Sequence, residues 1–165
     1  MRLLVFVAIA ALHTPTFADR AADFIKRYEG FKSSAYLCQA GEWAIGYGFT
    51  DKKLIAKGYI SQTEADIELD RICREIRIRL RRELKRQHLT EHEETAIISF
   101  IYNVGWYNFK CSRMFRLIVQ GKRGRVVADE FLRWVYVSQS GRKVKSRGIQ
   151  KRRVYEALMF TKGFS

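Results

Sequence analysis

The sequence predicts a mostly helical α+β fold, with a small β-hairpin lobe and a larger helical lobe joined by one long helix. Helical hydrophobic periodicity recurs through most of the 165 residues. One such stretch, from about residue 61 to 86, is much longer than the others, and a short alternating stretch near residues 35–45 is interrupted by turn residues. A single Pro and the absence of low-complexity runs indicate one folded unit.

The amino-terminal part is expected to form a short helix and then a hairpin. Asp19 can cap a helix over residues 20–29, which Gly30 would end because glycine tolerates the left-handed conformation. Strands at residues 35–38 and 43–45 would then form the hairpin, followed by a glycine-containing turn.

Two capping boxes mark the start of the main helices. Ser61 with Glu64 opens the long helix, and Thr90 with Glu93 opens an apolar helix that closes near residues 103–105. Three shorter helices are expected after it, with a polar loop over 138–145 before the last one: residues 112–120, 126–136 and 147–160.

Residues 1–18 are predicted to be a signal peptide, which leaves residues 19–165 as the folded domain. A basic start, an apolar run from Leu3 to Leu12 and the small-residue segment Thr16-Phe17-Ala18 fit this pattern. The run is too short to span a bilayer as a helix. The alternative is an uncleaved signal anchor, and in either case the protein is expected to be exported, as a periplasmic or secreted chain.

The formal charge of +14, from 31 basic and 17 acidic residues, predicts polyanionic partners. For an exported protein these are cell-wall polymers and anionic membrane surfaces. No nucleic-acid motif accompanies the basic residues, so no specific nucleic acid is expected, and we expect a monomer. Three cysteines, at positions 38, 73 and 111, allow one disulfide and a free thiol, or three free thiols.

Glu29 stands out as a candidate general acid. It falls at the carboxyl end of its helix, where the macrodipole disfavours negative charge, and Tyr28 and Phe31 flank it. Both influences favour the protonated carboxyl that a general acid needs. From these residues alone, a solvated surface glutamate is the simpler interpretation.

Several segments, taken in order, resemble phage-type lysozymes of glycoside hydrolase family 24. Glu29-Gly30, Cys38 and residues 41–48 resemble the active-site segment of that family, in which an Asp or Cys and then a Thr follow the Glu at fixed spacing. Further matching segments lie along the rest of the chain: Ser61–Ala65, Phe100–Gly105 with Phe109 and Ser112, Asp129–Phe131 with Arg133-Trp134, and Gly148-Ile149 with Arg152-Arg153 and Glu156.

The resemblance implies a lysozyme-like catalytic domain that cleaves the β-1,4 bond between N-acetylmuramic acid and N-acetylglucosamine in peptidoglycan. Glu29 would protonate the leaving oxygen, and Cys38 would take the place of the second carboxylate. The alternative for Cys38 is an inert thiol or half of a disulfide.

Two positions depart from the family pattern. Ala44 stands where the family has a Thr that helps to hold the attacking water, and Phe49 stands where it often has His. Another hydroxyl, from Thr50 or Tyr47, would then hold the water. Otherwise the protein is a lytic transglycosylase, or a peptidoglycan-binding protein with weakened catalysis.

By the same resemblance, substrate-binding residues are expected from both lobes. Tyr36 and Trp43 would lie on the hairpin side, and Asn103 would meet Trp134 on the helical side, unless Trp134 is only a core residue. Arg152, or its neighbour Arg153, would approach Glu29. No metal or cofactor is expected, because the nearest histidine pair, His88 and His92, has no Cys nearby to complete a site.

Overall fold

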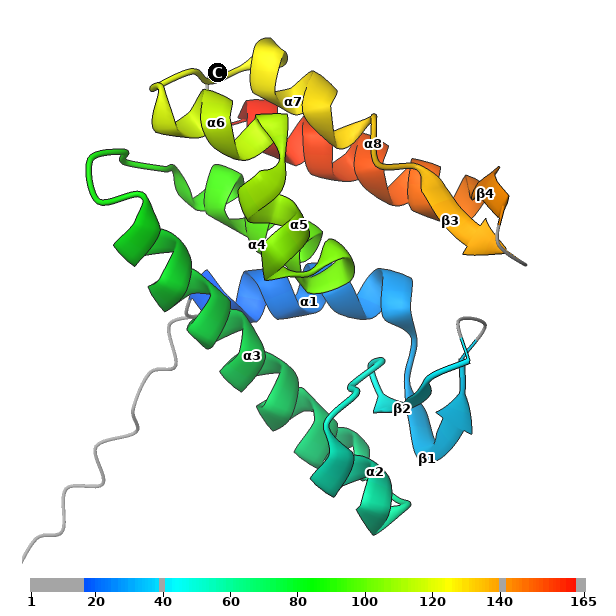
Figure 1. Cartoon of the computed structure of the whole chain (residues 1–165). Coiled ribbons are helices and arrows are strands. Elements are labelled where there is room, and N and C mark those ends of the chain that lie inside the picture. The colour runs from blue at the N-terminus through cyan, green and yellow to red at the C-terminus, as the bar shows by residue number, and fades with distance from the viewer. Residues whose placement is uncertain (1–16, 39–40, 140–141, 163–165) are drawn as a thin grey trace, which may run out of the picture.

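The computed structural model describes residues 17–38, 41–139 and 142–162, which fold into two lobes (Figure 1). A small lobe contains the first hairpin, a larger lobe contains most of the helices, and α3 runs from one to the other. The predicted mostly helical α+β fold is therefore confirmed. In chain order the elements are α1 (Phe17–Glu29), β1 (Lys32–Leu37), β2 (Trp43–Gly46), α2 (Lys52–Lys57), α3 (Gln62–Glu83), α4 (Glu91–Val104), α5 (Trp106–Cys111), α6 (Arg113–Val119), α7 (Arg125–Phe131), β3 (Tyr136–Gln139), β4 (Arg142–Lys145) and α8 (Arg147–Lys162).

The long helix α3 begins at the predicted capping box. The Ser61 backbone N–H donates to the Glu64 carboxylate at 2.8 Å, and the Glu64 N–H donates to the Ser61 hydroxyl at 3.2 Å. The buried residues follow a spacing of three or four along one face, so α3 packs against both lobes on the same side. They are Ala65, Leu69, Cys73, Arg77 and Leu80.

Helix α4 lies at the centre of the molecule. Every residue from Glu93 to Ile101 is buried, because α1, α3 and α8 all pack around this helix. Phe100 belongs to the core of the helical lobe, whereas Ile98 belongs to the core that α1 shares with the hairpin lobe. Helix α4 therefore connects the two hydrophobic cores, and its one buried serine, Ser99, lies between them in the sequence.

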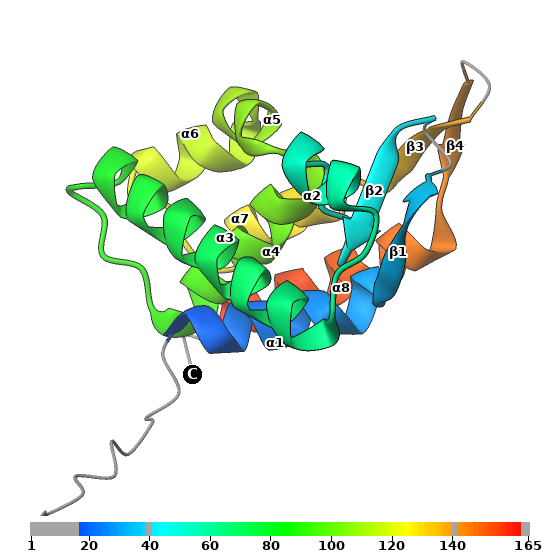
Figure 2. The same cartoon turned by 90° about the horizontal axis from the view of Figure 1, so that it is seen from below.

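A second hairpin was not predicted. The helix that we expected over residues 126–136 ends at Phe131. The end of that range and the expected polar loop (residues 138–145) contain strands β3 and β4 instead. Val137 pairs with Val144 across these strands, and the Ser146 N–H donates to the Val135 carbonyl oxygen at 2.9 Å, which closes the base of the hairpin. Cross-strand pairing therefore determines the conformation of this segment, which carries few apolar residues. Both hairpins project from the same side of the molecule, beyond the carboxyl end of α1 (Figure 2).

Other differences concern local boundaries. Helix α1 begins at Phe17 rather than after Asp19, since no Gly or Pro stops the helix between them, and α3 ends at Glu83 rather than near residue 86. Two short helices, α2 and α5, were not predicted. Asp51 caps α2 by accepting hydrogen bonds from the backbone N–H groups of its first turn.

The predicted signal peptide falls largely outside the described residues, which begin at position 17. Among the described helices, none combines the length and the apolar character needed to cross a membrane.

Candidate active site

Glu29 is the last residue of α1 and is held at a fixed position. Ala21, Ala22 and Ile25 bury one face of α1, so the helix cannot shift easily against α4. Gly30 then adopts a φ of 66°, which ends the helix as predicted and turns the chain toward β1. The Glu29 side chain remains 22% exposed, which leaves part of its carboxyl group accessible.

A buried network binds the inner side of the Glu29 carboxyl group. Arg152 of α8 donates to Glu29 Oε1 through Nη1, to Glu156 Oε1 through Nε at 3.1 Å, and to the Ser99 carbonyl oxygen through Nη2 at 3.0 Å. The Ser99 hydroxyl donates to Glu156 Oε1 at 2.6 Å. Because Arg152 uses all three guanidinium nitrogens, it fixes the orientation of Glu29 relative to both α4 and α8.

Arg153 extends this network to Asn103 and Trp134. Its guanidinium donates to Glu156 Oε2 at 2.6 Å, to the Asn103 side-chain oxygen, and to the Trp134 carbonyl oxygen at 3.1 Å. The Trp134 ring meets the edge of Phe100 with ring centroids 5.4 Å apart. Trp134 thus packs on the core, and Arg153 links its backbone to Asn103.

Tyr36 and Cys38 lie on the hairpin side. Tyr36 pairs with Ala44 across β1 and β2, so both side chains share one face of the hairpin. Burial, together with the charges of Glu29 and Cys38, raises the pKa of Tyr36. Ala44 is buried and contributes only a methyl group there.

Trp43 occupies the other face of the hairpin. It pairs with Leu37, and both side chains are more than half exposed, at 55% and 60%. Because neighbouring residues of a strand point to opposite faces, Trp43 lies on the face opposite to Tyr36 and Ala44. The structure therefore brings Tyr36, but not Trp43, toward Glu29.

The turn after β2 covers the second oxygen of Glu29. Gly48 has a φ of 90°, and a Cβ at this position would lie 3.8 Å from Glu29 Oε2. The Tyr102 hydroxyl on α4 donates to the Tyr47 carbonyl oxygen at 2.8 Å and so holds this turn in place. The Tyr47 hydroxyl itself donates to Asp66 of α3 at 2.8 Å.

This arrangement does not favour Thr50 or Tyr47 as the source of the hydroxyl group that Ala44 lacks. Tyr47 is buried and its hydroxyl is bound to α3, so it does not face the reaction site, while Thr50 is exposed beyond the buried Phe49. Tyr36, by contrast, is affected by the charges of both Glu29 and Cys38, which raise its pKa together with burial.

An open cavity of about 610 Å³ lies between α1 and the first turns of α8 and reaches Glu29. We call it the α1–α8 cavity. It is lined by Phe24, Arg27, Tyr28, Glu29, Asn103, Ser146, Gly148, Ile149, Lys151, Arg152 and Tyr155. Of the predicted substrate-binding residues, Asn103 and Arg152 line it, whereas Tyr36, Trp43 and Trp134 do not.

All three cysteines are described, and each is a free thiol, which corresponds to the three-thiol alternative. Burial raises the pKa of Cys73 to about 12, so this thiol stays protonated near neutral pH. Within the described ranges, no group of three or more His, Cys, Asp or Glu side chains is placed to hold a metal ion.

Three residues of the site were given no role from the sequence. Ser99 and Tyr102 lie within the apolar run of α4, and Glu156 lies four residues after Arg152 on α8. The sequence did contain a signal for these residues, namely polar side chains on the faces of two helices that were expected to be buried. Because buried polar groups need hydrogen-bond partners, such residues indicate a buried network.

A two-lobed, mostly helical fold, with a glutamate at the end of the first helix beside an open cavity, defines a lysozyme-like protein. The chain matches the phage lysozyme family over residues 26–156. It is 31% identical over 143 residues to an endolysin of Acyrthosiphon pisum secondary endosymbiont phage 1, covering 87% of this chain and 96% of the relative. The chain belongs to the phage lysozyme family, whose members are glycoside hydrolases that act on peptidoglycan.

Solved structures agree with this assignment. The endolysin from Escherichia coli O157:H7 phage FAHEc1 matches with a TM-score of 0.77 and 26% identity, covering 90% of this chain and 94% of that protein. The muramidase domain of SpmX from Asticaccaulis excentricus matches with a TM-score of 0.74 and 25% identity, covering 88% and 97%.

Proposed function

We propose that this protein is an exported muramidase that cleaves the β-1,4 bond between N-acetylmuramic acid and N-acetylglucosamine, with Glu29 as the general acid. The observation that carries this proposal is the position of Glu29. The carboxyl group is fixed from behind by Arg152 and remains partly open toward a 610 Å³ cavity. A general acid needs this combination of fixed orientation and access to the leaving oxygen.

Cys38 is proposed to act opposite Glu29, in place of the second carboxylate. In an inverting glycosidase that group activates a water molecule on the other face of the sugar ring. The shared influence of Glu29 and Cys38 on Tyr36 supports the location of both groups around one site. Tyr36 is then suited to contribute a hydroxyl that helps to hold the water.

A lytic transglycosylase is the second candidate, and Ala44 favours it. This residue is buried beside Tyr36 and offers no hydroxyl for water. In a transglycosylase the 6-hydroxyl of the muramyl residue attacks instead, so only one acid/base residue is required.

Mass spectrometry of the fragments released from purified peptidoglycan tests these proposals. The chain would be compared with Glu29→Gln, with and without a thiol reductant. Products with a reducing muramic acid support the muramidase, and 1,6-anhydro products support the transglycosylase.

Equal product formation by the Glu29→Gln protein would contradict the role of Glu29. If neither protein releases products but both still bind peptidoglycan, the site serves recognition, as in a binding protein. Amino-terminal sequencing of the exported chain tests the predicted cleavage after Ala18, and an uncleaved terminus would indicate a signal anchor.

A further inference from the structure

The α1–α8 cavity carries positive charge that the proposed reaction does not use. Arg27 projects from α1 and Lys151 from α8, and both side chains are exposed. Neither forms an ion pair with another described residue. The one acidic residue that lines the cavity, Glu29, is already bound to Arg152. The charge that remains available to a ligand in this cavity is therefore positive.

The same cavity has aromatic walls. Tyr28 of α1 and Tyr155 of α8 both line it, and Tyr155 is about half exposed, at 48%. Phe24 and Ile149 add apolar surface. Cations beside aromatic and aliphatic surfaces suit a ligand that combines carboxylate groups with short apolar parts.

Peptidoglycan presents such a ligand close to the bond that Glu29 is proposed to cleave. The sugar backbone itself is uncharged, whereas the peptide stem on each muramic acid carries free carboxylates and alanine methyl groups. A muramic acid that contributes its glycosidic bond to Glu29 brings its stem into the neighbourhood of this carboxyl group. The α1–α8 cavity is lined by Glu29 and by residues of α1, α4 and α8, and no described residue of the first hairpin lines it.

We infer that the α1–α8 cavity binds the carboxylates of the peptide stem, through Arg27 and Lys151. This inference rests on the proposed function, because it assigns the stem to a cavity next to the proposed cleavage site. Binding of the stem in this cavity gives the enzyme a preference for peptidoglycan with free stem carboxylates over peptidoglycan whose carboxylates have been neutralised.

The test compares the wild-type protein with Arg27→Gln/Lys151→Gln on two substrates. Both are purified peptidoglycan stripped of phosphate-containing polymers, and in one of them the free carboxyl groups are converted to methylamides. We expect the double variant to raise the apparent KM about fivefold on native peptidoglycan and less than about twofold on the amidated material, with kcat changed little on either.

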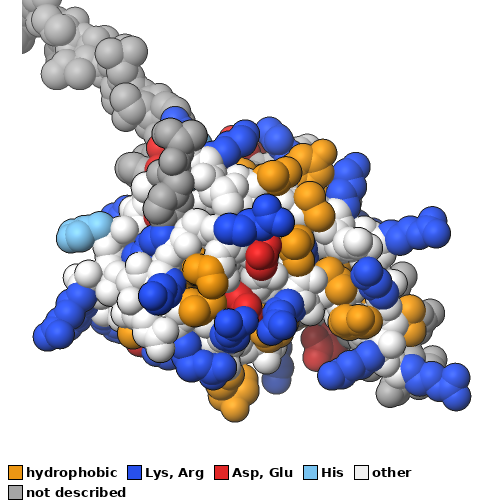
Figure 3. Space-filling view, turned by 90° about the horizontal axis from the view of Figure 1, so that it is seen from above, with side chains coloured by type: hydrophobic (Ala, Val, Ile, Leu, Met, Phe, Trp, Pro, Cys, Tyr) orange, Lys and Arg blue, Asp and Glu red, His pale blue; other side chains and the backbone are white. Residues whose placement is uncertain are grey.

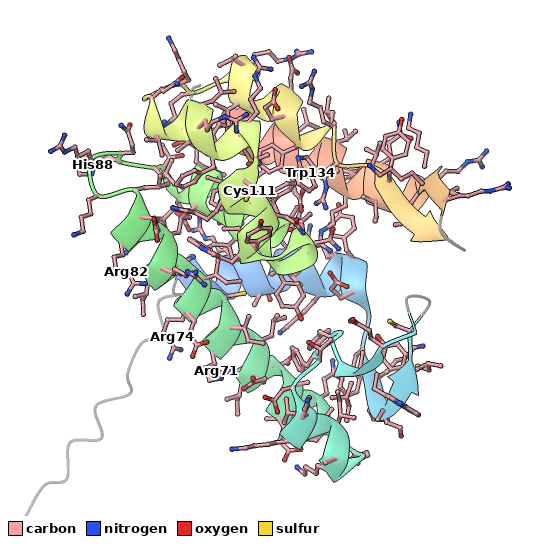
Figure 4. The ribbon with its side chains drawn as sticks, viewed as in Figure 1. Arg71, Arg74, Arg82, His88, Cys111 and Trp134 are labelled. Carbon is pink, nitrogen blue, oxygen red and sulfur yellow. The ribbon has the colours of Figure 1, made fainter. Side chains whose placement is uncertain are left out.

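The matched control is Arg74→Gln/Lys85→Gln, which removes the same charge. Arg74 lies on the outer face of α3, away from the start of α8 (Figure 4), and Lys85 is an exposed residue just after α3. We expect this control to show the wild-type KM ratio between the two substrates. A fivefold effect in the control, or an equal effect of Arg27→Gln/Lys151→Gln on both substrates, would overturn the inference.

Failure of the proposed function gives a different result. If the wild-type protein cleaves neither substrate, calorimetric binding of a soluble disaccharide that carries a tripeptide stem still tests the cavity. In that case weaker binding by Arg27→Gln/Lys151→Gln, but not by the α3 control, supports the inference, and unchanged binding contradicts it.

Discussion

At the scale of single residues, Glu156 accepts hydrogen bonds from Ser99, Arg152 and Arg153 while it is fully buried. Two buried guanidinium groups thus share one buried carboxylate, and only Arg152 has Glu29 as a second acidic partner. Burial lowers the pKa of Arg153, and the neighbouring Glu156 opposes this effect. The orientation of Glu29 therefore depends, through Arg152, on Glu156, which does not contact Glu29 itself.

Replacement of Glu156 by Gln is expected to destabilise the protein by about 3–5 kcal/mol, because it leaves buried guanidinium charge without its partner. Urea unfolding measures this change, and product release from peptidoglycan should fall as Arg152 loses its support. The exposed control Glu42→Gln should change the free energy of unfolding by less than about 0.5 kcal/mol. Equal stability of the two variants would show that the arginines do not need this carboxylate.

Replacement of Cys38 tests its proposed role as the second catalytic group. Cys38→Ala is expected to lower kcat at least about tenfold, because it removes the thiol that is proposed to activate the water. Cys38→Asp, which supplies a carboxylate, should retain activity. Cys111→Ala serves as the control, since this exposed thiol lies on α5 in the helical lobe. Full activity of Cys38→Ala in a steady-state assay would exclude a role for the thiol.

At the scale of elements, the turn at residues 46–48 and the start of α3 are determined by local chemistry. The capping box of α3 and the first hairpin were predicted because their signals lie within a few residues of sequence. The β3–β4 hairpin was missed because its strands carry few apolar residues, so its pattern resembled a helix end followed by a loop. Its pairing depends on contacts such as Val137 with Val144, which periodicity does not show.

Gly48→Ala is expected to reduce kcat and to cost about 1–2 kcal/mol of stability, because φ is positive and the new Cβ would approach Glu29 Oε2. Gly58→Ala is the matched control. Its φ of 75° imposes similar strain, but no heavy atom lies within 4 Å of its Cβ position. Thermal unfolding should therefore show similar losses, while only Gly48→Ala lowers kcat. A similar fall in kcat for both variants would indicate a general effect of strain.

The first turn of α3 should make stability depend on pH. The Lys57 ammonium group and the Ser61 N–H and hydroxyl lower the pKa of Glu64 to about 2. A lowered carboxyl pKa stabilises the fold above the unfolded-state value near 4.5, and this contribution is lost as the pH falls through 2. The difference in Tm between wild type and Glu64→Gln should be largest at pH 6 and narrow below pH 4.5. High salt should reduce it, since the group is exposed, and a pH-independent difference would contradict the assignment.

At the scale of the whole molecule, basic side chains dominate the surface. Figure 3 shows Lys and Arg side chains spread over one face, with hydrophobic side chains between them and few acidic groups. The net charge of +14 could be read from the sequence, and so could the family-like order of motifs. The separate contacts of Arg152 with Glu29 and of Arg153 with Asn103 could not be predicted from the sequence. The two arginines are adjacent on α8, and the packing of α1, α4 and α8 decides which partner each one reaches.

This charge predicts a salt-dependent activity on peptidoglycan. Raising NaCl from 0.05 to 0.3 M should raise the apparent KM several-fold, because salt screens attraction beyond about 8 Å at physiological ionic strength. The kcat at saturating substrate should change little. A KM that is independent of salt, measured on the same peptidoglycan preparation, would show that the surface charge does not assist binding.

The ion pair between Glu29 and Arg152 joins residues 123 positions apart. A chain that has been synthesised only as far as α7 already contains Glu29, the proposed general acid, but not the Arg152 guanidinium that orients it. Translation must therefore reach the last helix before the Glu29–Arg152 ion pair can form, and the proposed role of Glu29 predicts that products ending at α7 release no fragments from peptidoglycan. Completion of the polypeptide is thus a condition for the proposed activity.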